Sequence, residues 1–144
     1  LVAPYFAVAP RWYAWPDVET WARAARRLVD WIDSGPEVHG LRDRTHAADF
    51  PCYRVLPLDA VLRSFEVARR ADDPELLGAC TAPVLVLVPS HDTVADPEAM
   101  REAHAALGSA DKRLETFDDS DHLLFWDRDA EQALHTIVPF LTAP

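Results

Sequence analysis

The sequence predicts an α/β fold: parallel sheet strands with flanking helices and a helical cap insertion. The stretch "VLVLVP" (84–89) is apolar at every position, which is typical of a strand covered on both faces. Helical patterns and a second strand pattern follow it in alternation, so residues 81–144 are predicted to form a strand–helix–strand–helix unit. The first 80 residues are too long and too helical for a simple crossover, which favours an insertion between strands.

The composition is that of a globular chain and argues against several classes of function. The 144 residues are 49% hydrophobic, and a formal net charge of -10 would repel nucleic acid. No apolar stretch approaches the roughly 18 residues of a membrane span. Glycine is scarce, and no nucleotide-binding glycine motif occurs, so no cofactor is expected. Cys52 and Cys80 form no disulfide framework, and we interpret both as reduced, buried thiols of a cytoplasmic protein.

The N-terminal half is predicted to contain a strand end and a helical cap. Residues 1–4 begin without Met and are interpreted as the end of a core strand that enters from elsewhere, and residues 5–80 as the cap or lid. A first helix is predicted from Pro16 to Gly35-Pro36, which would cap and break it. Residues 36–56 are expected to be loop. Pro57 is predicted to start a second helix that ends near "RRADDP".

Residues 81–144 are predicted to be the C-terminal part of the core. Asp96 is expected to cap a helix that stops at Gly108, and the alternating "KRLETF" (112–117) to be a strand nearer the sheet edge. Asp127 is expected to open the last helix. The inward-facing positions predicted for that helix are Ala130, Leu134, Ile137, Val138 and Leu141.

Two polar residues follow the two predicted strands and are the candidate catalytic pair. Asp92 lies four residues past Val88, and His122 lies five past Phe117. Loops that leave the carboxyl ends of parallel strands open on one edge of the sheet, so the two side chains are expected to meet. A carboxylate that orients an imidazole and stabilises its charged form is the supporting half of a nucleophilic hydrolase.

Alternative interpretations of these residues are weaker. His91, Asp92, Asp121 and His122 are clustered ligand types, but their spacing matches no strong metal motif, so no metal is expected. The run "DDSD" (118–121) is interpreted as a solvated loop. The other histidines are assigned to helix surfaces, packing or the cap: His39, His46, His104 and His135.

Two segments resemble the C-terminal half of an α/β-hydrolase of the small carboxylesterase and monoacylglycerol-lipase-like group. "APVLVLVPSHDTVADPEAM" resembles the family's acid-bearing strand and loop, and "KRLETFDDSDHLLFWDRDAEQALHTIVPFL" its catalytic-histidine loop and final helix. On this resemblance, Asp92 matches the acid and His122 the base. "YRVLPLDAVLRSFEVAR" resembles the cap helices more loosely. Pro89 stands where many relatives have Gly.

The family's nucleophile, which sits in a GxSxG elbow before the cap, has no counterpart here. The serines, none of which lies in such a motif, are Ser34, Ser64, Ser90, Ser109 and Ser120. The chain is therefore expected to be a fragment that lacks the nucleophile-elbow half and is inactive alone. We expect the missing N-terminal half, or a second chain, to complete the sheet.

The resulting hypothesis is a serine hydrolase that acts on carboxylic esters, with a small apolar ester as its substrate. Aromatic side chains in the cap region are candidates for an acyl pocket: Phe6, Trp12, Trp15, Trp21 and Trp31. One alternative is an Asp nucleophile on the same frame, as in a dehalogenase or epoxide hydrolase. Another is a non-catalytic interaction module with the same fold. The residue at the missing elbow would distinguish the serine hydrolase from the enzyme with an Asp nucleophile.

Overall fold

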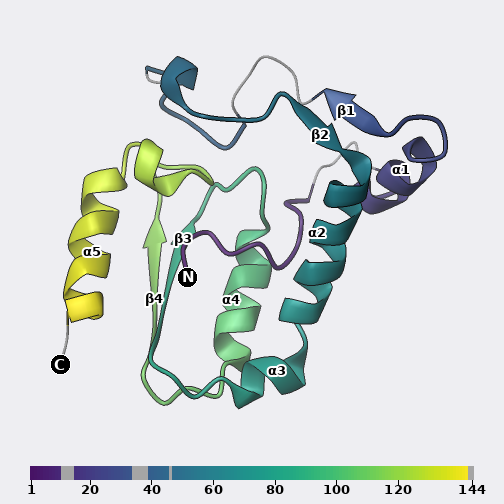
Figure 1. Cartoon of the computed structure of the whole chain (residues 1–144). Coiled ribbons are helices and arrows are strands. Elements are labelled where there is room, and N and C mark those ends of the chain that lie inside the picture. Colours follow the sequence, from purple (N-terminus) through teal and green to yellow (C-terminus); the bar gives the residue numbers. More distant parts are fainter. Residues whose placement is uncertain (11–14, 34–38, 46, 143–144) are drawn as a thin grey trace.

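The structure, a computed structural model, describes residues 1–10, 15–33, 39–45 and 47–142. A parallel strand pair lies between helices, and a smaller unit of two helices and a hairpin-like strand pair stands to one side (Figure 1). In chain order the elements are α1 (Val18–Ala25), β1 (Trp31–Asp33), β2 (Val55–Pro57), α2 (Leu58–Ala71), α3 (Pro74–Ala79), β3 (Val84–Pro89), α4 (Pro97–Ala106), β4 (Lys112–Phe117) and α5 (Ala130–Thr142), with 3-10 turns at Ala47–Asp49 and Leu124–Trp126.

β3 is the central strand of the described sheet. It pairs in parallel with β4 from Val84 opposite Lys112 to Pro89 opposite Phe117. On its other side lies the N-terminal stretch, where the Leu87 N–H donates to the Leu1 carbonyl at 2.9 Å and the Ala3 N–H to the Leu87 carbonyl at 3.0 Å. Among the described residues, β4 pairs only with β3, as expected of a strand at the edge of the sheet.

The two faces of β3 bury different side chains under different helices, which is why the strand is apolar throughout. Val86 and Val88 pack with α3 and α4 in one cluster that includes Met100. Leu85 and Leu87 pack on the opposite face with the Leu124 turn and α5. Figure 1 shows α4 and α5 on opposite sides of the strand pair. Burial of a strand on both faces requires this double cover, as the sequence predicts.

Side-chain caps mark where α3 and α4 begin. The Asp96 carboxylate accepts from the Glu98 N–H at 2.9 Å and begins α4, with Pro97 in the first turn. α2 begins directly after Pro57, as predicted, and buries Leu58 and Phe65. The stretch "PELLGA" before β3 forms the short helix α3, which Asp73 caps in the same way.

The first predicted helix is wrong in its second half. α1 ends at Ala25, and residues 31–33 form β1, which pairs antiparallel with β2 from Trp31 opposite Pro57 to Asp33 opposite Val55. The apolar residues after Ala25 continue the helical spacing, but the backbone partner offered by a segment far along the chain outweighs that local pattern. The Gly35-Pro36 stop lies outside the described residues.

The predicted start and inward face of the last helix are also corrected. α5 begins at Ala130, three residues after Asp127, because the Asp127 carboxylate binds other backbone N–H groups. Ala133 is buried against the sheet, with Ile137 and Phe140 beside it. Three of the positions predicted to face inward are at least half exposed: Leu134, Val138 and Leu141.

Within the part of the chain that the structure describes, no helix is long and apolar enough to cross a membrane. Both cysteines are free thiols, but Cys52 is exposed, so the prediction that it is buried is wrong; Cys80 is half-buried. Cys52 lies between the Ala47–Asp49 turn and β2, where the chain runs over the surface and gives a small apolar side chain no core to join.

Candidate active site

The carboxyl ends of β3 and β4 hold the two loops that carry the predicted pair. The Ser90 N–H donates to the Phe117 carbonyl at 2.9 Å, so the strands stay paired up to the point where the loops leave. Asp92 follows β3 by three residues, and His122 follows β4 by five. The parallel arrangement brings both loops to one edge of the sheet.

Asp92 and His122 are in direct contact at this edge. The His122 Nδ1 lies 2.8 Å from Asp92 Oδ2, and the Asp92 side chain is 0% exposed while that of His122 is 24% exposed. Since a carboxylate can only accept, Nδ1 must carry the proton. Nε2 is then the basic nitrogen, and within the described residues it has no hydrogen-bond partner.

The second oxygen of Asp92 fixes the carboxylate in place. Asp92 Oδ1 accepts from the N–H groups of Val94 and Ala95 at 2.8 and 2.7 Å. One oxygen is thus held by the loop backbone and the other is directed at the imidazole. This arrangement compensates the burial of the charge and orients the ring.

Asp121 ties the two loops to each other and was missed by the sequence analysis, which placed it in a solvated run. Its side chain is buried: Oδ1 accepts from the Thr93 and His122 N–H groups, both at 2.7 Å, and Oδ2 from the Thr93 hydroxyl at 2.8 Å. Ser120 in the same run is also buried and accepts from the Asp129 N–H at 2.7 Å. The interpretation of 118–121 as a solvated loop is wrong for these two residues.

Asp127 is a second buried carboxylate, which the sequence analysis placed at the start of the last helix. It is 6% exposed and accepts four backbone N–H groups, from Arg42, Asp43, Asp121 and Arg128, at 2.8 to 3.0 Å. Burial alone would raise the pKa of Asp127, but these donors together outweigh it and hold the pKa below its ordinary value. No local pattern distinguishes such a residue from a helix cap, because two of the donors lie far away in sequence.

The cluster of metal-ligand types does not assemble into a site. His91 is exposed, and both Asp121 oxygens are engaged by Thr93 and His122. Across the described ranges, no group of three or more His, Cys, Asp or Glu side chains is arranged to hold a metal ion. Asp92 and His122 instead form a hydrogen bond with each other.

The described serine hydroxyls have partners other than His122. The Ser64 hydroxyl donates to the Val61 carbonyl, that of Ser90 to Asp118 Oδ1, and that of Ser109 to the Asp111 carbonyl. Ser120 is engaged by Asp129, as described above. Ser34 lies outside the described residues.

An apolar cleft of about 440 Å³ lies between the N-terminal stretch and the cap helices. Residues 5–10 form one wall, and α1 and α2 contribute Val18, Phe65 and Ala68. The Asp96 N–H donates to the Ala7 carbonyl and the Ala9 N–H to the Val94 carbonyl, so this wall is bonded to the loop that carries Asp92.

Of the aromatic residues predicted to line an acyl pocket, Phe6 lines this cleft. Three others are largely exposed, at 90% for Trp15 and 58% for both Trp21 and Trp31. Trp12 lies outside the described residues. Among the described residues, the aromatic side chains that line the cleft are Tyr5, Phe6 and Phe65, and no tryptophan does.

Comparison with known proteins places this chain in a family. The family model for serine aminopeptidases, S33, matches residues 1–129. No curated protein matches the chain by sequence. The chain is similar to solved structures of a monoacylglycerol lipase from Paleococcus ferrophilus (23% identity, TM-score 0.77), the metagenome-derived lipolytic enzymes LipS and LipT (17%, 0.78), and a soluble variant of the Saccharomyces cerevisiae monoglyceride lipase in complex with a substrate analog (17%, 0.75).

These matches cover nearly all of this chain and about half of the other chains. The covered shares of this chain are 97%, 97% and 94%, and those of the solved chains are 57%, 52% and 53%. At such sequence identities the likeness establishes the α/β-hydrolase fold. It also establishes that the chain spans little more than half the length of the proteins it resembles.

Proposed function

The chain belongs to the serine aminopeptidase family, S33, and from this premise we propose that it supplies the acid and base of a serine hydrolase that acts on carboxylic esters. The observation that carries the proposal is the 2.8 Å contact between His122 Nδ1 and the fully buried Asp92 carboxylate. An imidazole held in this way has one nitrogen free to move a proton.

In the proposed reaction, His122 Nε2 removes the proton of a serine hydroxyl as that oxygen attacks the ester carbonyl carbon. The imidazolium, stabilised by Asp92, then gives the proton to the departing alkoxide, which leaves as the alcohol. Water hydrolyses the acyl-enzyme by the same route: His122 takes a proton from water and returns it to the serine oxygen as the acid departs.

We propose that the nucleophile lies outside this chain. The described serine hydroxyls are bonded elsewhere, and the chain spans about half the length of its structural relatives. In this proposal an N-terminal half, or a second chain, completes the sheet beside Leu1–Ala3 and brings the nucleophile to His122. The 144 residues alone would then be inactive, because His122 would have no hydroxyl to activate.

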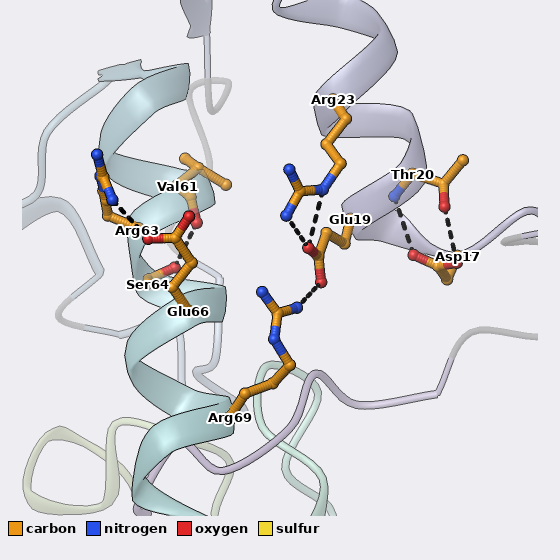
Figure 2. Close-up of polar contacts among 9 residues, drawn as sticks. All are labelled: Asp17, Glu19, Thr20, Arg23, Val61, Arg63, Ser64, Glu66 and Arg69. Carbon is orange, nitrogen blue, oxygen red and sulfur yellow. Dashed lines mark hydrogen bonds and ion pairs between the residues drawn. The ribbon is translucent and has the colours of Figure 1, made fainter.

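We propose that this cleft receives the acyl chain, although neither Asp92 nor His122 lines it, and that its apolar walls favour an ester over a substrate with a free ammonium group. An aminopeptidase has to bind a cationic amino terminus, which requires an available carboxylate. Of the two carboxylates that line this cleft, Glu19 is ion-paired with Arg23 and Arg69, while Asp17 caps α1 by accepting from the Thr20 N–H and hydroxyl (Figure 2). Hydrogen bonds from Arg23, and then from Arg69, hold the pKa of Glu19 below its ordinary value, so it stays paired at neutral pH.

The test uses the complete protein that contains this chain. We expect it to hydrolyse p-nitrophenyl butyrate faster than an aminoacyl p-nitroanilide and to form a covalent adduct with a fluorophosphonate probe. His122→Ala is expected to lower kcat/KM by about 10⁴-fold, because the base is lost. His135→Ala, at an exposed position of α5, is the control and should leave the rate unchanged.

Each contrary result has its own meaning. Full activity in His122→Ala would overturn the proposed base. Preference for the anilide would overturn the ester assignment. Turnover of a haloalkane or epoxide without a fluorophosphonate adduct would indicate an Asp nucleophile, and no adduct with no turnover would indicate an interaction module.

A cytoplasmic location stays a prediction, supported by the two free thiols. Immunofluorescence outside that compartment would contradict it.

A further inference from the structure

We propose that the segment 40–43 of the cap is a positioning element for the His122 base, and that Asp127 anchors it. The inference rests on the proposed function and deepens it by naming residues outside the acid–base pair. Two independent observations carry it: the seating of Gly40 against the His122 side chain, and the hydrogen bonds that join residues 42 and 43 to the His122 loop through Asp127.

Gly40 lies against the Cβ of His122. Its φ of +78° belongs to the left-handed region that favours glycine, and its carbonyl accepts from the Leu123 N–H at 2.9 Å. A Cβ on Gly40 would come within 2.8 Å of the His122 Cβ and 3.2 Å of a Val94 methyl. The absence of a side chain therefore lets residue 40 lie this close to His122. The next residue, Leu41, is buried at 5% exposure, which holds the segment against the body of the protein.

Asp127 joins the segment to the loop. Its Oδ2 accepts from the Arg42 N–H at 2.8 Å and from the Asp121 N–H at 2.9 Å, so one oxygen binds both chain segments. Its Oδ1 accepts from the Asp43 N–H at 2.8 Å and the Arg128 N–H at 3.0 Å. The Arg42 guanidinium adds a bond of 2.9 Å to the Asp118 carbonyl.

The connection continues from Asp127 to the imidazole through Asp121. The Asp121 backbone is held by Asp127, and the Asp121 carboxylate accepts the His122 N–H and also binds Thr93. Thr93 follows Asp92 directly in the chain. The backbone of His122 is thus fixed from two sides, by Asp121 toward the Asp92 loop and by Gly40 toward the cap.

The position of the His122 backbone decides whether Nδ1 meets Asp92, because a histidine side chain has only two rotatable bonds. A displacement on the order of 1 Å at a catalytic group can lower a rate by about 10²-fold without altering the binding site. Residues 40–43 contact the His122 side chain and the loop that carries it, so their position determines how well Nδ1 is aligned with Asp92. Loss of the segment's contacts should therefore lower kcat and leave KM almost unchanged.

The experiment compares Gly40→Ala and Asp127→Asn in the complete protein. Gly40→Ala pushes on the His122 Cβ, and Asp127→Asn replaces one of the two acceptor oxygens by an NH2 group, which cannot accept from an N–H. We expect each to lower kcat for p-nitrophenyl butyrate by about 10²-fold with KM within about threefold. Proton NMR should show that the hydrogen-bonded His122 Nδ1 proton resonance is lost or exchanges faster with water.

Two matched variants serve as controls. Gly78→Ala adds the same methyl group in α3, where nothing lies within 4 Å of it. Glu131→Gln removes the same charge at an exposed position in the first turn of α5. Both should retain the wild-type kcat and the wild-type Nδ1 resonance.

Folded variants of Gly40 and Asp127 with wild-type kcat and an unchanged Nδ1 resonance would overturn the proposal. A rise in KM with unchanged kcat would also overturn it, because that result would mean a binding role. If both variants fail to fold, Arg42→Ala removes only the guanidinium bond to Asp118, and an unchanged kcat and resonance there would overturn it likewise. If the wild-type protein hydrolyses no ester, the proposed function fails, while the Nδ1 resonance still tests the positioning role.

Discussion

The sheet region (β3, α4, β4 and α5) and the cap region (α1, β1, β2 and α2) differ in how deeply their side chains are buried. In the sheet region, Leu87 and Val88 are completely buried, and helices cover both faces. In the cap region, a smaller cluster around Leu58 and Phe65 is supplemented by ion pairs at the surface, and Leu28 is 87% exposed. The comparison indicates that the contact between Asp92 and His122 lies in the well-packed region, and that residues 40–43, between β1 and β2, reach it from outside that region.

The largest expected effect tests the packing of the sheet region. Leu87→Ala removes a side chain that is 0% exposed, and we expect it to lower the free energy of unfolding of the complete protein by about 3 to 5 kcal/mol. Leu28→Ala, in the cap, should change it by less than about 0.5 kcal/mol. Urea denaturation measures both. Equal losses from the two variants would remove the difference between the regions.

A close backbone contact between α3 and the end of α4 gives the next effect. A Cβ on Gly108 would lie 1.9 Å from the Gly78 carbonyl oxygen, so Gly108→Ala must move α3 away from the end of α4. We expect a loss of about 2 to 3 kcal/mol in denaturant melts. Gly78→Ala is the partner variant, and it should be neutral or stabilise α3 by up to about 1 kcal/mol. A neutral Gly108→Ala would show that the α3–α4 junction is loosely packed.

The link between the two regions should be sensitive to acid. Because the pKa of Asp127 is lowered in the folded state, its contribution to stability is present above the unfolded pKa of about 4 and is lost as the pH falls through the lower folded value. At pH 7 we expect Asp127→Asn to cost about 2 kcal/mol. Denaturation at a series of pH values should show this difference shrinking below pH of about 4. A difference that is constant with pH would contradict the charged role of Asp127.

The smallest effect is expected within the cap. Arg26 binds Asp59 through two nitrogens, at 2.7 and 3.1 Å, and this joins the end of α1 to the start of α2 on the surface. The hydrogen bond from Arg26 lowers the pKa of Asp59. Asp59→Asn should destabilise the protein less than Leu87→Ala, Gly108→Ala or Asp127→Asn does, and 1 M salt should remove most of the difference. An effect that is large and independent of salt would mean that the ion pair holds the cap.

Much of the sheet region was predictable because its signals are local. The apolar run at 84–89, the cap at Asp96 and the alternation at 112–117 each determine an element within a few residues. The cap region was less predictable. The pairing of β1 with β2 joins residues more than twenty apart, and the apolar spacing from Val18 to Ile32 suits a helix as well as it suits the observed turn into a strand.

By itself, the sequence determined that Asp92 and His122 would share one edge of a sheet, because parallel strands bring their carboxyl ends together whatever the loops contain. Only the tertiary structure decided what Gly40, Asp121 and Asp127 do. A buried carboxylate accepts from whichever N–H groups the folded chain brings near it. Whether a position requires glycine depends on which atoms a Cβ there would meet. Those partners are distant in sequence, so no local pattern predicts them.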